Sequence, residues 1–429
     1  MSELKNNHHW EKIFNQYQIL AKIEKDGHFI ISSSEINKFR EARLMTKFDC
    51  STQLPEIFAK NNLALLPISR GNYIIANFKI FEPFEENNIE IEKISFPSYL
   101  ESINYNNISS EAIALNCAYV SGMIKNFMED EDVFLTVSGR MSSSSFEFKI
   151  KLDKLNNFLT IAVDNAQIEI DAGYESLNTL SLIEAKNYIS KDFIIRQLYY
   201  PYRLWLNKKL SKEIKPIFLT YTNGIFHFRE YFFNDPNNYN SIRLKKEKKY
   251  QIKEELIIDK DLIIKILNEV SIIEEPKIPF PQADAFNRII NLCEIIYEKN
   301  NLTKEEITIN YGFDKRQTDY YTNAGIYLNL IRKEKEVDKI SFTLTDKGKQ
   351  LFYLSIAHRQ IAFVKIILSH LVFNRVLKLF FDKKELPNKN EIINIMKNSN
   401  LYHIESEETF NRRASTISSW VNWILDLID

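Results

Sequence analysis

One acidic residue and a Glu-x-Lys triplet stand close together in the segment QIEIDAGYESLNTLSLIEAKN. Asp171 ends one apolar alternating run, and after twelve intervening residues a second run carries Glu184 and Lys186. If the two runs are neighbouring strands, Asp171 and Glu184 lie side by side, and Lys186 shares a strand face with Glu184. Two carboxylates and one lysine at a strand edge are the minimum set for a metal-dependent phosphodiesterase, because hard oxygen ligands hold Mg²⁺ and the metal polarises the phosphate and activates water. The spacing therefore predicts metal-dependent phosphodiester hydrolysis.

The residues around the triplet help to distinguish a site from a solvated hairpin with an exposed ion pair. Charged residues are common on surface hairpins, where an ion pair contributes little. Here, Leu182 and Ile183 precede Glu184 in a run that is typical of a buried strand, where unpaired charge is costly. The next segment, DFIIRQLYYPYRLWL, predicts a helix with Asp192 as its N-cap and Gln197 near its start. These neighbours favour a catalytic site.

In this order of strand, turn, strand and helix, the chain resembles the PD-(D/E)xK nuclease superfamily, and more closely its type II restriction endonucleases. The resemblance implies that Asp171 and Glu184 ligate Mg²⁺, with the carbonyl group of Ala185 close by, and that Mn²⁺ is tolerated. It also implies that Lys186 orients the attacking water or steadies developing charge. Gln197 would be a further catalytic residue on the following helix.

One neighbouring residue departs from the family's motif, and two others are further acids close to it. Ile170 occupies the position at which the family has a Pro. Glu169 shares a strand face with Asp171, and Glu175 lies in the predicted turn. Each of these two glutamates could assist at the metal or could be a charge at the edge of the sheet, and the sequence leaves both interpretations open.

Length and composition indicate a protein with several cores and no long linkers. The chain of 429 residues has room for roughly two to four domains, and 45% of its residues are hydrophobic. Nine Gly and eleven Pro argue against low-complexity regions. Cys50, Cys117 and Cys293 have no CxxC spacing, so they indicate neither a zinc site nor a disulfide framework. No apolar stretch reaches membrane-spanning length and the N-terminus lacks a signal sequence, so we predict a cytoplasmic protein with no membrane partner.

Charge gives no overall sign of a polyanionic partner, because the formal net charge is −1. Contacts with DNA must therefore rest on local basic surfaces. Other chemistries lack their motifs, since the chain has no GxGxxG, GxxxxGK(S/T), GxSxG or HExxH. The seven histidines are dispersed, which disfavours the cluster of ligands that a zinc hydrolase needs.

The chain divides into three predicted regions of an α/β protein. Residues 1–95 form an N-terminal α+β region, residues 96–270 a mixed-sheet PD-(D/E)xK nuclease core, and residues 280–429 a mostly helical domain with a winged helix. Within the core, IFLTYTNGIFHFREYFF predicts a hairpin that turns at Asn223 and Gly224. NEVSIIEEPKIPFPQADAF has three prolines and no regular period, which marks the boundary before the last region.

Basic residues in the first two regions are candidates for DNA contacts. EINKFREARLMTKFD predicts a helix with Arg40, Arg43 and Lys47 on one face, and Arg70 lies in a turn between two strands. Solvated charge is one interpretation of this face. REARLMTKFD and LPISRGNY also resemble the N-terminal part of certain type II restriction enzymes, which favours contacts with DNA. In the core, Arg140 precedes a predicted loop at Ser142–Ser145, where it could reach a phosphate or simply shape a turn.

The last region has the layout of a winged helix-turn-helix. Thr303 and Glu306 form a predicted capping box that opens a short helix. A longer helix starts at Asp314, and the charged hairpin from Arg332 to Thr343 would be the wing. Arg, Gln and Asn side chains at the start of such a helix can read base edges, although some winged helices could serve only protein–protein contact. The residues predicted to contact DNA are Lys315, Arg316, Gln317, Tyr320, Tyr321 and Asn323.

The end of the chain adds a further basic feature. Arg412 and Arg413 precede Ser415 and Thr416, so a basic, hydroxyl-rich helix start could lie on a phosphate backbone. RQTDYYTNAGIYLNLI, IPFPQADAF and this final segment resemble C-terminal parts of type II restriction enzymes. The resemblance therefore favours DNA as the partner of the whole last region.

We expect from these features a type II restriction endonuclease that cleaves duplex DNA at a short specific site. Duplex DNA is then the partner, a homodimer fits this class, and a cognate DNA methyltransferase belongs to the same system without being a stable subunit. One alternative is a modification-dependent or transposition nuclease of the same superfamily. Another is a non-catalytic winged-helix regulator, which leaves the Glu-x-Lys strand unexplained.

Overall fold

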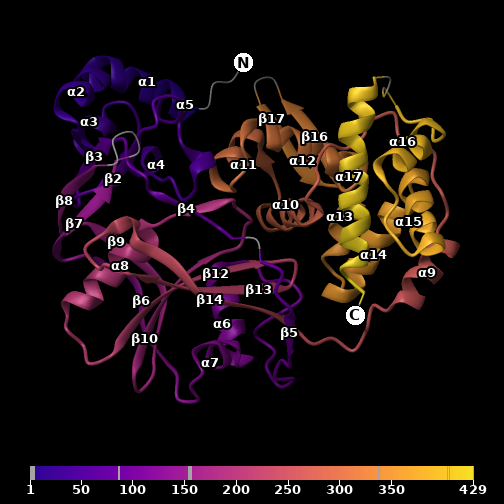
Figure 1. Cartoon of the computed structure of the whole chain (residues 1–429), viewed down its shortest axis with the longest axis horizontal. Helices are drawn as coiled ribbons and strands as arrows, with labels where there is room; N and C mark the ends of the chain where they lie inside the picture. Colours follow the sequence, from indigo (N-terminus) through magenta and orange to yellow (C-terminus); the bar gives the residue numbers. More distant parts are fainter. Residues whose placement is uncertain are drawn as a thin grey trace. The chain divides into compact units, whose positions relative to one another are not determined.

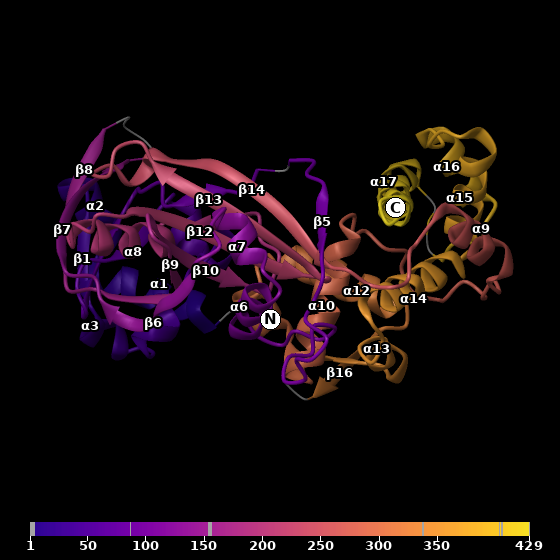
Figure 2. The same ribbon diagram turned by 90° about the horizontal axis from the view of Figure 1, so that it is seen from below.

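The structure is a computed structural model, which describes residues 5–85, 87–152, 157–336, 339–402, 404 and 406–428. The chain is a mixed α and β protein that forms two compact units. The first unit comprises Met1–Ile103, Ser110–Tyr221 and Ile225–Gln251. The second unit comprises Asn104–Ser109, Thr222–Gly224 and Ile252–Asp429. The elements of both units are labelled in Figures 1 and 2.

A seven-stranded sheet is the centre of the first unit (Figure 1). β10 and β12 run parallel, whereas β9 and β10 run antiparallel, so the predicted mixed sheet is confirmed. In spatial order the strands are β5 (Ile91–Ile94), β14 (Ile242–Ile252), β13 (Ile225–Phe233), β12 (Glu213–Thr222), β10 (Thr179–Lys186), β9 (Gln167–Glu175) and β6 (Phe134–Ser142).

Two helices pack against β9 and β10 and bury them. They are α6 (Glu111–Val120) and α8 (Arg196–Asn207). β10 is buried from Leu180 to Ala185, which explains why its sequence is a nearly continuous apolar run. A third helix of this region is α7 (Met123–Met128).

Aromatic side chains fix α8 in place. Phe146 of β7 (Ser145–Lys151) packs edge-on against Tyr200, with ring centroids 5.3 Å apart, and Phe148 packs at the same distance against Tyr199. β7 pairs with β8 (Phe158–Asp164). Pro201 lies inside α8, where it cannot donate a backbone hydrogen bond.

The predicted hairpin is present between β12 and β13. Asn223 and Gly224 have φ angles of 49° and 76°, and two successive residues with positive φ are what a tight turn with the twist of a hairpin requires. The Asn-Gly pair therefore determined this turn locally.

A small sheet with its own core forms the N-terminal part of the first unit. The sheet is antiparallel, and Trp10, Phe14 and Phe58 contact one another edge-on in the core beside it. Its strands are β1 (Phe29–Ser32), β3 (Asn72–Ala76) and β2 (Ala64–Pro67), in that order. Its helices are α1 (Lys5–Tyr17), α2 (Ile19–Asp26), α3 (Ser33–Asn37), α4 (Ala42–Met45), the 3-10 helix η1 (Ser51–Gln53) and α5 (Glu56–Lys60).

The single helix predicted for EINKFREARLMTKFD is wrong. The segment forms two short helices, α3 and α4, and Lys47 lies beyond the second. The carboxamide oxygen of Asn37 accepts a hydrogen bond of 2.7 Å from the backbone N–H of Ala42. This side chain caps a new helix start and so competes with continuation of the first helix. Arg40 therefore does not share a helical face with Arg43.

Strands from before residue 95 join the core region by hydrogen bonding. β4 (Phe81–Pro83) pairs with β11 (Asp192–Ile194), and β5 is an edge strand of the seven-stranded sheet, next to β14. Compact packing of the first unit therefore runs across the boundary that the sequence suggested near residue 95.

The second unit contains the element order that the sequence predicted for its helix-turn-helix part. Three helices precede a hairpin, and a short strand, β15, pairs with the second strand of that hairpin. In chain order the elements are α9 (Lys260–Glu269), α10 (Phe286–Lys299), β15 (Leu302–Thr303), α11 (Lys304–Asn310), α12 (Lys315–Tyr327), β16 (Ile331–Glu336), β17 (Lys339–Leu344), α13 (Asp346–Leu351), α14 (Ile356–Leu368), α15 (Leu371–Lys383), α16 (Lys389–Lys397) and α17 (Glu407–Leu425).

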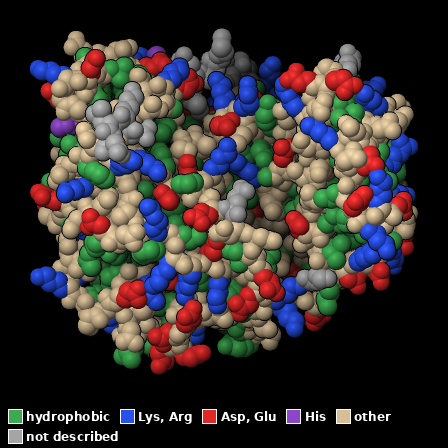
Figure 3. All heavy atoms as spheres, in the orientation of Figure 1, with side chains coloured by type: hydrophobic (Ala, Val, Ile, Leu, Met, Phe, Trp, Pro, Cys, Tyr) green, Lys and Arg blue, Asp and Glu red, His purple; other side chains and the backbone are tan. Residues whose placement is uncertain are grey.

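Charges of both signs are interspersed on the face that Figure 3 shows. This mixture agrees with the formal net charge of −1. Within the described part of the chain, no single helix is both long and apolar enough to cross a membrane; only α14 and α15 taken together, bent by 104°, meet that test by length and composition.

Candidate active site

Asp171 and Glu184 lie on adjacent strands, at the end of their antiparallel pairing. Ala172 of β9 is opposite Ile183 of β10, and Asp171 and Glu184 are the next residues along the two strands. A carboxylate oxygen of Asp171 accepts a hydrogen bond of 2.8 Å from the backbone N–H of Ala185. The side chain of Asp171 therefore points across to the strand that carries the Glu-x-Lys triplet.

Lys186 and Glu184 form a buried ion pair on one face of β10. The ammonium Nζ lies 2.5 Å from Oε1 of Glu184, and the two side chains are 11% and 9% exposed. Nζ also donates a hydrogen bond of 3.2 Å to the carbonyl oxygen of Ala185. One cation thus lies against two of the oxygen atoms that were predicted to ligate a metal.

Gln197 reaches the same carboxylate from the first turn of α8. Its Nε2 donates a hydrogen bond of 2.7 Å to Oε1 of Glu184 and a second one of 3.3 Å to Oδ1 of Asp49. Its Oε1 is buried and has no hydrogen-bond partner among the residues that the structure describes. The structure therefore brings together Asp171, Glu184, Lys186 and Gln197, all four residues predicted for the chemistry.

Asp192 has a different role from the one predicted. It lies in β11, and the residue that caps α8 is Ile195. The carboxylate of Asp192 instead accepts hydrogen bonds from the backbone N–H of Ser51, at 2.8 Å, and from the hydroxyl of Ser51. It ties the start of η1 to β11.

Two further carboxylates at the site were not predicted. Asp49 precedes η1 and is held by Gln197, and Glu111, the first residue of α6, lies 4.0 Å from Nζ of Lys186. Ser109 and Ser110 directly precede Glu111, and hydroxyl residues are typical of a helix start, so a carboxylate in that first turn was the available signal for Glu111. Asp49 has no comparable signal, because it lies in a loop far from the motif along the chain.

Burial and mutual repulsion raise the pKa values of Glu184, Asp171 and Glu111. Burial raises the pKa of Glu184 to about 8; Lys186 opposes this rise, and Asp171 and Asp49 add to it. Burial also raises the pKa of Asp171 and that of Glu111. For Lys186, burial acts to lower the pKa, but the carboxylates of Glu184 and Asp49 outweigh it and hold its pKa well above the ordinary value.

The charges at this site are not balanced by its lysines. Among the described residues, the carboxylates of Asp49, Glu111, Asp171 and Glu184 influence one another here, and their lysine partners are Lys186, which is buried, and Lys47, which is 70% exposed and 3.7 Å from Asp49. The site therefore favours the binding of additional positive charge.

The residues fit a hard divalent cation. Nζ of Lys186 lies against both an oxygen of Glu184 and the carbonyl oxygen of Ala185, so these two oxygen atoms converge. In the described part of the chain, no three His, Cys, Asp or Glu side chains are arranged to hold a metal ion by themselves. Mg²⁺ does not need such a group, because it is usually held by one or two carboxylates and keeps several waters.

The two acids that were left open as metal assistants have other partners. Glu169 lies opposite Arg140 across β9 and β6, and the two side chains form an ion pair at 3.3 Å with about half of each exposed. Arg140 thus lies within β6, and the loop predicted for Ser142–Ser145 is shorter than expected, since Ser143 and Ser144 alone separate β6 from β7. Glu175 ends β9 and forms an ion pair of 2.6 Å with Lys212.

The basic residues predicted for the N-terminal region differ in their availability. Arg40 donates a hydrogen bond of 2.6 Å to the side chain of Asn6, which holds it within the unit. Arg43 is exposed on α4, and Arg70 is exposed in the turn between β2 and β3, where it was predicted.

In the second unit, two of the six residues predicted on α12 are engaged inside the fold. Gln317 completes a capping box with Asp314, and its Oε1 also accepts a hydrogen bond of 3.4 Å from Arg288. Tyr321 is buried beneath the guanidinium of Arg288. The residues of this set with exposed side chains are Lys315, Arg316 and Asn323, and Tyr320 is partly buried.

The two arginines of α17 also differ. Arg412 forms an ion pair with Glu408 one helical turn away. Arg413 is half-buried, and its Nε and Nη1 have no hydrogen-bond partner in the described part of the chain. Burial lowers the pKa of Arg413, and Tyr320 is among the groups that face it.

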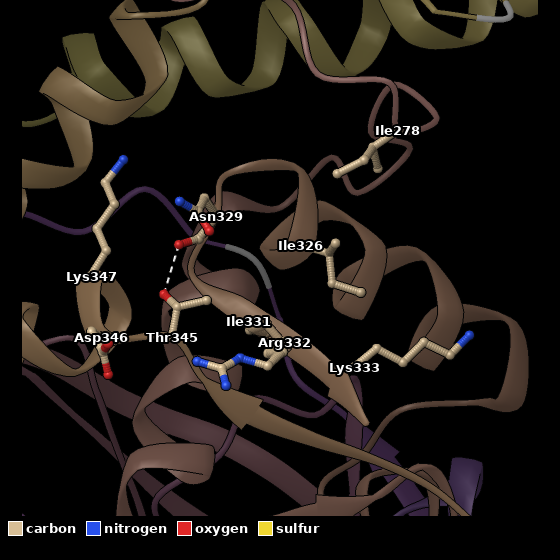
Figure 4. Close-up of a pocket in the computed structure, with 9 residues that line it drawn as sticks. All are labelled: Ile278, Ile326, Asn329, Ile331, Arg332, Lys333, Thr345, Asp346 and Lys347. Atoms are coloured by element: carbon tan, nitrogen blue, oxygen red, sulfur yellow. Dashed lines mark hydrogen bonds between the residues drawn. The ribbon is translucent and has the colours of Figure 1, made fainter. Parts of the chain in front are cut away.

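The second unit also has a cavity of about 570 Å³ at the base of its hairpin (Figure 4). The hydroxyl of Thr345 donates a hydrogen bond of 2.8 Å to the backbone carbonyl of Asn329 at its edge. Its lining combines isoleucine side chains with three cations and one carboxylate: Ile278, Ile326, Asn329, Ile331, Arg332, Lys333, Thr345, Asp346 and Lys347. Figure 4 shows Lys333 and Lys347 extending away from each other, so these cations do not converge on one point.

Comparison with known families divides the chain into three consecutive matches, each described as a domain of unknown function. They are DUF6996 over residues 7–75, DUF6997 over residues 76–251 and DUF7226 over residues 288–429. No curated protein and no solved structure is detectably similar to the chain. Asp49 falls in the first match, whereas Glu111, Asp171, Glu184, Lys186 and Gln197 fall in the second.

Proposed function

We propose that the chain is a Mg²⁺-dependent endonuclease that hydrolyses phosphodiester bonds in duplex DNA at a short specific site, as a type II restriction endonuclease does. The observation that carries the proposal is the buried group formed by Asp171, Glu184 and Lys186, where the pairing of two adjacent strands ends. A purely structural ion pair would be expected to balance its charges. Here acidic side chains outnumber the lysines, which is costly unless a proton or a cation binds.

Each residue of the group has a role that its contacts support. Asp171 and Glu184 would ligate the metal, together with the carbonyl oxygen of Ala185. When bound, Mg²⁺ supplies a Lewis acid that polarises the phosphate and lowers the pKa of water. Gln197 holds one oxygen of Glu184 by donating a hydrogen bond, so that the carboxylate keeps a fixed orientation.

Lys186 would act as the positive group of the reaction. Its pKa lies well above the ordinary value, so the side chain remains an ammonium at neutral pH. With Glu184 engaged as a metal ligand, the ammonium of Lys186 would be available to donate a hydrogen bond to the attacking water or to the phosphate. Because the site is largely buried, little bulk water weakens this interaction.

Exposed polar side chains of the second unit would supply specificity. Lys315 and Arg316 at the start of α12, and Asn323 further along it, are suited to phosphate and base contacts. With a net charge of −1, the chain depends on such local groups to bind DNA.

The test is digestion of large unmethylated and methylated DNAs with Mg²⁺, followed by sequencing of the ends. We expect discrete ends at one short sequence, no cleavage with EDTA, and no cleavage by Glu184→Ala purified in parallel. Cleavage of methylated DNA alone would assign the chain to the modification-dependent nucleases. Failure to cut either DNA with Mg²⁺ or Mn²⁺, or cutting by Glu184→Ala at the wild-type rate, would remove the proposal.

A further inference from the structure

The N-terminal part of the first unit contributes a carboxylate to the candidate active site, although the motif lies more than a hundred residues further along the chain. Oδ1 of Asp49 accepts a hydrogen bond from Nε2 of Gln197, and the same nitrogen donates to Glu184. Asp49 is 8% exposed. The amide of Gln197 is therefore held between one residue of the motif and one residue outside it.

The backbone around Asp49 is fixed from both sides. Its N–H donates a hydrogen bond of 2.6 Å to the side chain of Gln53, and its carbonyl oxygen accepts one of 2.9 Å from the N–H of Ile194. Two residues later, Ser51 donates to Asp192 through both its backbone and its hydroxyl. Asp192 and Ile194 are the ends of β11, the strand that leads into α8 and Gln197. Asp49 and Gln197 thus depend on the same strand for their positions.

We propose that Asp49 is a positioning residue, which orients the amide of Gln197 so that its N–H group faces Glu184. The proposal rests on the proposed function for the role of Glu184 itself. If the amide turned over, its Oε1 would face two carboxylate oxygens, and this arrangement is repulsive. An acceptor at position 49 therefore selects the orientation in which Gln197 donates to Glu184.

This assignment makes the candidate site composite. The match to the first domain of unknown function ends at residue 75 and includes Asp49, whereas the metal-binding candidates lie in the second match. The N-terminal part would then support the candidate site through Gln197, in addition to any contact with DNA that Arg43 or Arg70 makes.

A double-mutant cycle on the full-length protein tests the link. Asp49→Ala should lower the cleavage rate by about 10- to 100-fold, as the loss of a partner behind a metal ligand typically does. In a Gln197→Ala background the same change should have almost no further effect, because Asp49 acts through Gln197. Asp49→Asn keeps an acceptor oxygen and should retain most of the activity. Glu56→Ala, which removes an exposed carboxylate paired with Lys60, is the matched control and should cut normally.

A second readout does not depend on cleavage. The shift in Tm on adding Mg²⁺ or Ca²⁺ should be smaller for Asp49→Ala than for the wild type, and similar for Asp49→Ala, Gln197→Ala and the double variant. Additive effects of the two changes in both readouts, or Asp49→Asn as damaging as Asp49→Ala, would overturn the proposal. A wild-type protein that binds metal but cuts no DNA would remove the proposed function and leave the link to be judged by the Tm shifts. A wild-type protein that does neither would remove both proposals.

Discussion

Glu184 has two properties that favour different charge states: its burial favours the protonated acid, and its contact with Lys186 favours the carboxylate. It is buried among other carboxylates, which raises its pKa to about 8, and it is also the central acceptor for Lys186 and Gln197. In the metal-free protein, the stability that comes from its proton is complete below the ordinary pKa of 4.5 and is lost as the pH rises through about 8. A metal ion must displace that proton in order to bind.

Metal binding should therefore strengthen with pH. Between about pH 6 and about pH 8 the apparent affinity for Mg²⁺ should rise by up to about tenfold per pH unit, because one proton leaves Glu184 for each ion bound. Calorimetry in buffers of different ionisation enthalpy would measure both the affinity and the released proton. Glu169→Gln, which changes an exposed acid on the neighbouring strand, should keep this dependence. An affinity that is flat over this range would contradict the raised pKa of Glu184.

Lys186→Ala should affect the chemical step more than metal binding. Groups that stabilise developing charge typically contribute on the order of 10²–10³ in rate, whereas the carboxylates that hold the metal stay in place. Single-turnover cleavage at saturating Mg²⁺ is the measurement. Lys212→Ala removes a lysine paired with Glu175 near the other end of β9 and should cut at the wild-type rate. A loss below about threefold for Lys186→Ala would make Lys186 a structural residue.

At the scale of elements, features that depend on neighbouring residues were predicted, whereas contacts between distant parts of the chain were not. The apolar runs of β9 and β10 and the Asn-Gly turn follow from neighbouring residues, so the sequence placed Asp171, Glu184 and Lys186 together. The break between α3 and α4 depends on the side chain of Asn37, which the helical pattern conceals.

The residues that sequence reasoning missed come from elements that meet only in the folded chain. Asp49 reaches the site because its loop is bonded to β11, and Glu111 reaches it because α6 packs against β9 and β10. Gln317 shows the opposite error, since a side chain suited to reading bases is used to cap its own helix.

Substitutions of Arg316 and Gln317 should distinguish an effect on DNA recognition from an effect on folding stability. Arg316→Ala should weaken binding to the specific site by about 1–3 kcal/mol and leave Tm unchanged, because the side chain is exposed. Gln317→Ala should instead lower stability by roughly 0.5–2 kcal/mol, because it removes part of a capping box. Fluorescence anisotropy with Ca²⁺ and thermal unfolding would measure the two effects. A change in base preference for Gln317→Ala at unchanged Tm would reverse these roles.

At the scale of the whole molecule, the near-neutral net charge means that DNA binding depends on where individual basic side chains lie. The formal net charge is −1, and both signs are interspersed on the face in Figure 3. A general attraction to polyanions is therefore not expected. Each phosphate contact should contribute measurably to the salt dependence of the DNA-binding constant.

Lys315→Ala should reduce that salt dependence. The slope of log K against log salt concentration should fall in magnitude by about 0.9, and affinity should fall similarly for specific and unrelated duplexes, if Lys315 neutralises one phosphate. Binding titrations at several salt concentrations would measure the slope. Lys349→Ala, a change of another exposed lysine of the second unit, provides the comparison. A loss confined to one sequence would mean that Lys315 reads a base.

Pro201 gives α8 a mechanical property that bears on the candidate active site. In a regular helix the N–H of residue 201 would bond to the carbonyl group of residue 197, and proline has no N–H to donate. The backbone carbonyl group of Gln197 therefore lacks its helical hydrogen bond to the next turn. The aromatic packing of Tyr199 and Tyr200 anchors the body of the helix, while the turn that carries Gln197 takes its direction from side-chain contacts. If Glu184 ligates a metal ion as proposed, this first turn is the part of α8 whose backbone would resist a small adjustment of the amide least.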